Sequence, residues 1–226
     1  VPQKGGNNSI RIDVHSCWQS MLGIVALAYG IKEFAKPDSQ ALLAWSALLL
    51  GVVTLAVFVR RQLRLPQPLI DFRLLSAAPI ATGIVIALVA SMTLIGFELV
   101  LSQRLQLVLG KSPLEAGAFV LPISLGSFFA GPVAGALIGR IGCPRVIAAG
   151  LVMCASGIAG YLCLNDASAL VQVATLALCG VGIGSSLTAS STLVMTNVLE
   201  DRAGMAGSVE GVAYEFGGGF GVTIFG

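Results

Sequence analysis

Two acidic residues, Glu210 and Glu215, lie in the otherwise apolar and glycine-rich segment at residues 203–226. No Lys or Arg follows Arg202, so neither acid has a cationic partner in its own segment. A carboxylate in the middle of a bilayer costs about 2.5–3.5 kcal/mol on insertion scales, and such acids tend to mark ion or substrate pathways. If this segment crosses a membrane, the two carboxylates are candidates to exchange protons or to attract a cation.

The spacing of the two acids gives them different roles. Five residues along a helix correspond to a rotation of about 140°, so both acids cannot point into one narrow pathway. We expect one to face a central cavity and the other to bond to a neighbouring helix. Glu210, about 12 Å of helix rise into the segment, is the preferred exchange site, and Glu215, about 20 Å in, is expected to couple proton binding to helix movement. The alternative is that both acids only pair with polar groups of a neighbouring helix.

The composition of the chain explains why a membrane is expected. Of its 226 residues 56% are hydrophobic and only 11% are charged, and the mean hydropathy is +0.91, which is outside the range of soluble globular proteins. The charge-free intervals between clusters of charge are near or above the roughly 18 residues that a spanning helix needs. They are residues 14–31, 39–59, 74–97, 116–139, 146–165 and 167–199. With residues 203–226 they predict an all-α polytopic membrane protein with about seven transmembrane helices.

Signals for the start of a helix support these boundaries. Residues 112–115, Ser-Pro-Leu-Glu, have the pattern of a capping box, with Ser112 as N-cap and Glu115 reaching back to it. Pro144 suits the first turn of the next helix. Asp201 precedes the last helix, where a negative charge suits the positive end of the helix dipole.

Metal, disulfide, nucleotide and nucleic-acid chemistry are not expected. The five cysteines form no C-x-x-C pair, and His15 has no Cys/His cluster beside it. The Gly-Val-Gly-Ile-Gly run at residues 180–184 lies inside an apolar interval rather than at a strand-to-helix turn, so it is not a dinucleotide fingerprint. The net charge of +2 gives no reason to invoke nucleic acid. No cofactor is predicted.

Glycines at four-residue spacing instead predict close packing of helices. Pro132, which lies among them, removes a backbone donor and is expected to kink its helix. Three stripes have this spacing: Gly180 and Gly184; Gly131, Gly135 and Gly139; and Gly217 and Gly221.

Polar residues that follow the interval at residues 74–97 are expected at the outer membrane boundary. Glu98 lies about 32 Å of helix rise from the start of that span. Gln103 and Gln106 come after it and are candidates to line an external vestibule.

Two stretches of the sequence resemble one family of transporters. Residues 110–117, Gly-Lys-Ser-Pro-Leu-Glu-Ala-Gly, followed by Leu121-Pro122, are similar to the link between the ninth and tenth helices of the fourteen-spanner drug:proton antiporters of the major facilitator superfamily. Residues 209–210 and 214–221 are similar to the thirteenth helix of that family. The resemblance covers essentially the whole chain and is nearest to bacterial methyl viologen and quaternary ammonium efflux proteins. We therefore expect a partial major facilitator fold.

The resemblance implies a domain organisation. Residues 1–76 would be a cytoplasmic lead-in and two extra linker helices. Residues 77–226 would be the first part of the second six-helix bundle, truncated in its fifth helix. On this interpretation the chain is an internal piece of a larger transporter, and the N-terminal helix bundle is a missing partner.

The resemblance also implies a gating motif, from which this sequence departs in places. Residues 135–142, with Arg140, are similar to the cytoplasmic loop motif of the superfamily, but Gly139 stands where the fuller motif has an acid. Some relatives have an acid where this chain has Ser127, and a further acid where it has Gly211. The two glutamates named above are therefore the principal acidic candidates.

The function that the resemblance implies is proton-driven export of lipophilic cations, such as quaternary ammonium compounds or methyl viologen, across the bacterial cytoplasmic membrane. Such export would confer drug resistance. A deprotonated glutamate would attract the cation, and protonation from the outer face would release it. Phe128, Phe129, Phe220 and Ser127 are candidates for the substrate cavity, where the aromatic rings would add cation–π attraction.

Other classes of protein remain open. A proton-coupled symporter or an exporter of another small solute would share the fold. A symporter of a neutral or anionic solute should have Lys or Arg, or a richer set of hydrogen-bonding groups, inside the bundle, and the predicted spans contain no Lys or Arg. A membrane-embedded enzyme would need a nucleophile, an acid/base pair or a metal constellation near one depth, and none is visible. A receptor or scaffold would have little use for costly buried acids.

The distribution of Lys and Arg predicts the orientation of the chain. If the spans alternate, nine basic residues collect on one side and four on the other, and the positive-inside rule assigns the larger set to the cytoplasm. The larger set is Lys4, Arg11, Arg60, Arg61, Arg64, Arg73, Arg140, Arg145 and Arg202, and the smaller set is Lys32, Lys36, Arg104 and Lys111.

Cysteine labelling of the intact transporter in cells tests this orientation. A cysteine introduced at Ser39 or Ser168 should react with a membrane-impermeant maleimide from outside. A cysteine at Gln67 should react only from the inside. The opposite pattern would overturn the predicted orientation.

Overall fold

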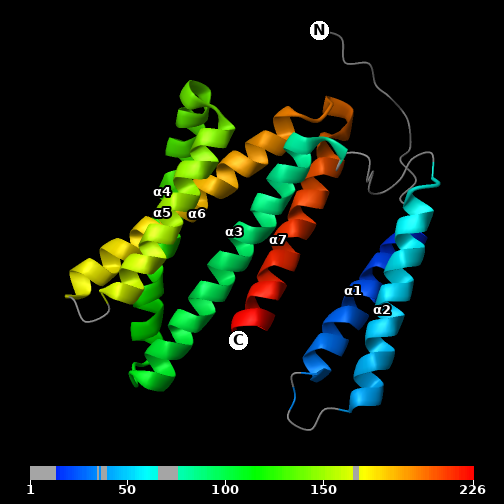
Figure 1. Cartoon of the computed structure of the whole chain (residues 1–226), viewed down its shortest axis with the longest axis horizontal. Coiled ribbons are helices and arrows are strands. Elements are labelled where there is room, and N and C mark those ends of the chain that lie inside the picture. The colour runs from blue at the N-terminus through cyan, green and yellow to red at the C-terminus, as the bar shows by residue number, and fades with distance from the viewer. Residues whose placement is uncertain (1–13, 35, 37–39, 66–75, 165–167) are drawn as a thin grey trace. The chain divides into compact units, whose positions relative to one another are not determined.

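The computed structural model of the chain is all-helical over the residues that it describes, which are 14–34, 36, 40–65, 76–164 and 168–226 (Figure 1). The chain divides into two compact units, Val1–Phe72 and Arg73–Gly226. Some residues of the topology prediction lie outside the described ones: Lys4, Arg11, Ser39, Gln67 and Arg73.

The first unit is a helical hairpin of α1 (Val14–Phe34) and α2 (Ala41–Gln62). The two helices are antiparallel, because each end of the hairpin joins the start of one helix to the end of the other. At one end the side-chain amide of Gln62 donates a hydrogen bond to Ser16 at 2.7 Å, and both side chains are buried. At the other end the rings of Phe34 and Trp45 meet edge to face at 5.2 Å. The buried polar pair fixes the register, since an unpaired buried amide or hydroxyl is costly.

The second unit is a bundle of long helices joined by short connections. Its elements are α3 (Ala78–Gln103), the π-helical turn η2 (Arg104–Val108), α4 (Pro113–Ile141), α5 (Cys143–Cys163), α6 (Ala169–Thr196), the 3-10 turn η3 (Glu200–Arg202) and α7 (Ala203–Phe225). α6 is the central helix, since it packs against α4, α5 and α3, while α7 lies along α3 (Figure 1).

Every predicted span forms a helix. Five of the helices in the described part of the chain are long and apolar enough to cross a membrane, namely α2, α3 with η2, α4, α5 and α6. The helices α1 and α7 form over the predicted residues but are not among these five. In α7 the cause is the two glutamates and the many glycines, the same residues that suggest function.

Two of the three predicted helix-start signals, at Ser112 and Pro144, are confirmed. The hydroxyl of Ser112 accepts a hydrogen bond from the backbone N–H of Glu115 at 3.4 Å, and the Glu115 carboxylate accepts one from the backbone N–H of Ser112 at 2.8 Å. Pro144 lies in the first turn of α5. Gly142 separates α4 from α5 at a φ of 83°, a left-handed conformation that residues with a Cβ rarely adopt.

The helix that begins at Ala78 is longer than the sequence predicts. The charge pattern ends this span at Phe97, but the helix continues to Val108, about 16 Å further. It continues because Leu101 and Leu105 are buried in a core shared with α4, α5 and α6. Glu98 is therefore half-buried within a continuous helix rather than at its end.

Two of the three glycine stripes pack closely, as predicted. A Cβ at Gly180 would lie 2.0 Å from the carbonyl oxygen of Ile123 in α4, and a Cβ at Gly184 would lie 2.4 Å from that of Ser127. On α7, a Cβ at Gly217 would lie 2.3 Å from the carbonyl oxygen of Leu88 in α3. Only glycine permits these backbone approaches.

The stripe at Gly131, Gly135 and Gly139 is different. Gly131 has one ordinary contact, to Thr188, and nothing in the described chain lies within 4 Å of a Cβ placed at Gly135 or Gly139. The buried face of α4 within this unit is the neighbouring one that carries Ala130 and Ala134, so the close packing predicted for the stripe stays a prediction. Pro132 does not break α4, which is continuous through it.

Substitution of Gly180 tests the contact between α4 and α6. Gly180→Ala is expected to destabilise the bundle by about 1–3 kcal/mol, because the added methyl group meets a backbone oxygen that cannot rotate away. The measurement is the midpoint of thermal unfolding in detergent. Gly117→Ala, in α4, is the matched control, since no atom lies within 4 Å of its Cβ position. Equal midpoints for the two variants would contradict the close contact.

Candidate functional site

Glu210 is the buried acid of α7, with 3% of its surface exposed. Its carboxylate accepts a hydrogen bond from the hydroxyl of Tyr214 at 2.8 Å and one from the hydroxyl of Ser191 in α6 at 3.1 Å. Tyr214 lies four residues after Glu210, so helix geometry places the two side chains on one face. The carboxylate thus joins α7 to α6 through neutral donors.

The same part of α7 is attached to α3. The hydroxyl of Ser91 in α3 donates a hydrogen bond to the backbone carbonyl of Tyr214 at 2.7 Å. Ser190 in α6 also interacts with the Tyr214 side chain. We call Glu210, Tyr214, Ser91, Ser190 and Ser191 the Glu210 cluster. It is the place where three helices of the bundle share polar contacts.

The carboxylate of Glu210 has no basic partner in the described part of the chain. The one salt bridge among the described residues is in the first unit, between Lys36 and Glu33 at 2.5 Å. Hydroxyl groups can either donate to a carboxylate or accept from a carboxylic acid. The hydroxyl groups of the cluster are therefore suited to bond to either form of a carboxyl group, and no cationic side chain of the described residues pairs with Glu210.

Glu215 lies on a different face of α7 and is exposed. The two acids therefore do not share one direction, as their spacing requires. Glu210, the preferred exchange residue, is the acid that bonds to a neighbouring helix, and the side chain of Glu215 is exposed.

Arg104 occupies a position that the sequence did not predict. It lies within the candidate span Ala78–Val108, half-buried, with its guanidinium over the ring of Tyr161 and 3.4 Å from the tyrosine hydroxyl. Arg104 lies seven residues past the predicted end of that span at Phe97, so the expectation that the spans contain no Lys or Arg stays a prediction. Arg104 is nevertheless remote from Glu210, since it is about 31 Å along α3 from Gly83, which contacts Ser190 of the cluster.

The other candidate residues are not brought to the Glu210 cluster. Phe128 and Phe129 pack edge to face at 5.3 Å on the exposed surface of α4, and Phe220 packs against Phe216 at 6.0 Å. Ser127 lies against Gly184 of α6. The remaining candidates are exposed or half-buried away from α7: Gln103, Gln106, Gly131, Pro132, Gly135, Gly139 and Arg140. Their roles in substrate binding and gating stay predictions.

The hydroxyl partners of Glu210 were not identified from the sequence. One signal for them exists, because a tyrosine four residues from an acid on a helix faces that acid. A second signal is the run of hydroxyl residues in the otherwise apolar α6, at Ser185, Ser186, Thr188, Ser190, Ser191 and Thr192. Such groups need hydrogen-bond partners in an apolar environment.

The helices and the buried acid define an integral membrane protein with a polar site inside a helical bundle. The chain belongs to the Major Facilitator Superfamily, whose sequence profile matches residues 18–222. The resemblance on which the fold was predicted is thereby confirmed, and the structure is part of a major facilitator fold.

Three bacterial relatives illustrate the similarity. Methyl viologen resistance protein SmvA of Salmonella typhimurium is 36% identical over 228 residues, covering 100% of this chain and 46% of that protein. Multidrug efflux pump LfrA of Mycolicibacterium smegmatis is 31% identical over 100% of this chain and 45% of its own length. Multidrug resistance protein Stp of Mycobacterium tuberculosis is 29% identical over 100% of this chain and 42% of its own length.

The chain spans under half the length of these curated relatives. The relatives are bacterial, and the family and the apolar helices make this chain an integral protein of the bacterial cytoplasmic membrane. Their names describe export and resistance rather than catalysis.

Chemical labelling tests the difference in burial between the two acids. In a variant of the intact transporter that lacks native cysteines, Glu215→Cys should react readily with a methanethiosulfonate reagent, because position 215 is exposed. Glu210→Cys should react only slowly, because position 210 is 3% exposed. Ser208→Cys, at an exposed position of α7, is the control for a reactive site. Equal rates at 208, 210 and 215 would contradict the burial of Glu210.

Proposed function

We propose that this chain is part of a proton-driven exporter of small lipophilic cations and that Glu210 is its exchange site. The observation that carries the proposal is a buried carboxylate whose partners in the described chain are hydroxyl groups. The names of the relatives support it, since they include a methyl viologen resistance protein and a multidrug efflux pump. Methyl viologen is itself an organic dication.

The exchange depends on competition for one negative charge. Deprotonated Glu210 attracts a lipophilic cation from the cytoplasmic side, while Ser191 and Tyr214 donate hydrogen bonds that stabilise the carboxylate. A proton arriving from the outer side neutralises the carboxylate and removes the attraction. The cation is then released, and the protonated acid can donate to the oxygen of Ser191.

Coupling to movement follows from the position of α7. Rocking of one helix bundle against another, which exposes a central site to each side in turn, is the common mechanism of such transporters. Glu210 bonds to α6, whereas the backbone near Tyr214 bonds to α3, so a change in the charge of Glu210 alters one of these two contacts. The partner in this movement is a second helix bundle, and Glu215 on the open face of α7 is the candidate to respond to it.

Replacement of the two acids tests the exchange. Glu210→Gln in the intact transporter should preserve expression, because glutamine fills the same space and can accept one of the two hydrogen bonds. It should abolish proton release from proteoliposomes when a quaternary ammonium compound is added, because the amide cannot titrate. Glu215→Gln should reduce the rate of exchange through loss of coupling.

The matched control is Glu115→Gln, the same substitution at an exposed helix start, where glutamine also serves in a capping box. It should exchange protons at the parental rate. If Glu210→Gln and Glu215→Gln both did so too, α7 would not be the coupling element.

A further inference from the structure

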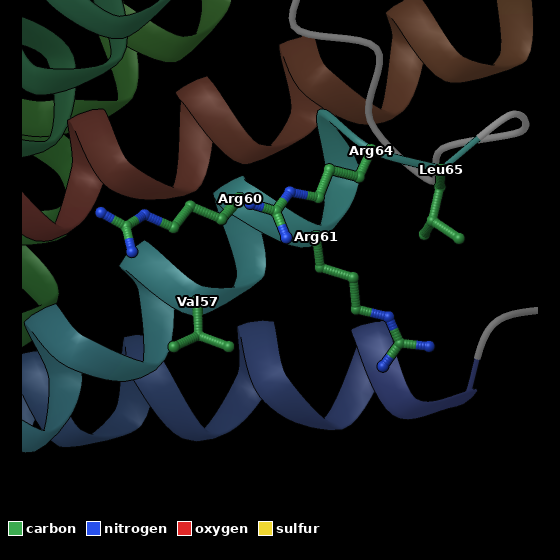
Figure 2. Close-up of a pocket in the computed structure, with 5 residues that line it drawn as sticks. All are labelled: Val57, Arg60, Arg61, Arg64 and Leu65. Carbon is green, nitrogen blue, oxygen red and sulfur yellow. The ribbon is translucent and has the colours of Figure 1, made fainter.

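The first unit has a basic pocket that the proposed transport does not use. It lies at the end of α2, has a volume of about 380 Å³, and is lined by Val57, Arg60, Arg61, Arg64 and Leu65 (Figure 2). Val57, Arg60 and Arg61 lie in the last two turns of α2, and Arg64 and Leu65 follow in the turn after Gln62, where Leu65 still bonds to the carbonyl of Arg61. Arg60 and Arg64 are four positions apart, as are Arg61 and Leu65, so neighbouring turns of the chain meet at the pocket. The side chains of Arg60 and Arg64 extend in the same direction along α2, and that of Arg61 extends the opposite way (Figure 2).

Three arginines line this pocket, so its positive charge favours the binding of an anion. No acidic side chain of the described residues pairs with Arg60 or Arg64. Like charges four positions apart on a helix repel each other, so an anion held between them stabilises the end of α2. Guanidinium groups bind phosphate through two parallel hydrogen bonds, which makes a phosphate-bearing ligand the best match.

The arginines are held at a fixed place on the hairpin. Gln62, which lies between them in the sequence, is buried and bonded to Ser16 of α1. That contact fixes the last turn of α2 and leaves Arg60 and Arg64 on its exposed side. The pocket therefore lies at a helix end that the bond between Gln62 and Ser16 holds in place.

The surface next to the pocket is apolar and exposed, which favours a lipid over a soluble phosphate as the ligand. Leu49, Val53 and Val57 continue the same face of α2 away from the arginines and are 66%, 51% and 48% exposed. The 22 residues of α2 rise about 33 Å, close to the thickness of the hydrocarbon core, so Arg60 lies at headgroup depth. The exposed apolar side chains of α2 can contact an acyl chain, and the arginines at the end of the helix can bind the phosphate of the same lipid.

We propose that Arg60 and Arg64 bind the phosphodiester of an anionic membrane lipid. The acyl chain of that lipid lies along Leu49, Val53 and Val57. The hairpin of α1 and α2 is then a lipid-anchored part of the transporter, and this role is independent of the exchange at Glu210.

Binding of fluorescent phosphatidylglycerol to the purified transporter in detergent tests the proposal. The double variant Arg60→Gln with Arg64→Gln should bind about tenfold more weakly, because each basic group near a lipid phosphate contributes several-fold to affinity. Arg60→Lys with Arg64→Lys should lose less, since charge remains and only the paired geometry is lost. The single Gln variants, each expected to lose about threefold, serve if the double variant does not fold.

The control removes the same charge elsewhere. Lys32→Gln with Lys111→Gln should leave lipid affinity unchanged; an equal loss would show that net charge alone attracts the lipid and would overturn the site. Unchanged binding by the Arg60 and Arg64 variants would also overturn it and would indicate that another part of the protein occupies the pocket. Displacement of the lipid by an equal concentration of glycerol phosphate would identify a soluble phosphate site instead.

Discussion

The absence of hydrogen-bond partners in hydrocarbon is the constraint on which the rest of this structure depends. It confines the spanning backbone to helices, and it makes hydroxyl side chains bond to their own helix. In α6, Ser185, Ser186 and Thr188 each donate to the carbonyl four residues earlier. Ser191 does not, because its hydroxyl donates to Glu210. This departure from the local rule identifies a polar contact between α6 and α7, the one on which the proposed exchange depends.

Close backbone approach is the second feature that organises the bundle. Between apolar helices in lipid there is little hydrophobic driving force, so association depends on packing and on hydrogen bonds. Glycines supply the packing at α6 against α4 and at α7 against α3, and Gly182 of α6 meets the backbone of α5 at Cys154 in the same way. The central position of α6 follows from having small residues on several faces. The Glu210 cluster lies beside such close approaches, since Gly217 of α7 meets Ser91 of α3 and Gly83 of α3 meets Ser190 of α6.

Much of the fold could be predicted from the sequence, because charge-free intervals, caps and glycine spacing are local signals. The capping box at Ser112 and the span at α6 are examples. The extension of α3 to Val108 could not be predicted, because charge marks the end of an apolar interval but not the end of a helix that keeps burying Leu105. The partners of Glu210 were also missed, since the sequence shows which residues share a helix face but not which faces of α6 and α7 meet. For the same reason the sequence shows the glycine spacing at Gly135 and Gly139 but not that, within this unit, α4 packs through the neighbouring face with Ala130 and Ala134.

The bond from Ser91 to α7 ends on a backbone oxygen, not on a side chain. Any residue at position 214 carries that oxygen, so the attachment of α7 to α3 does not depend on the tyrosine. The tyrosine hydroxyl, in contrast, bonds to Glu210 and interacts with Ser190 of α6. A substitution at position 214 can therefore change the hydrogen bonding of Glu210 while the bond from Ser91 still holds α7 against α3.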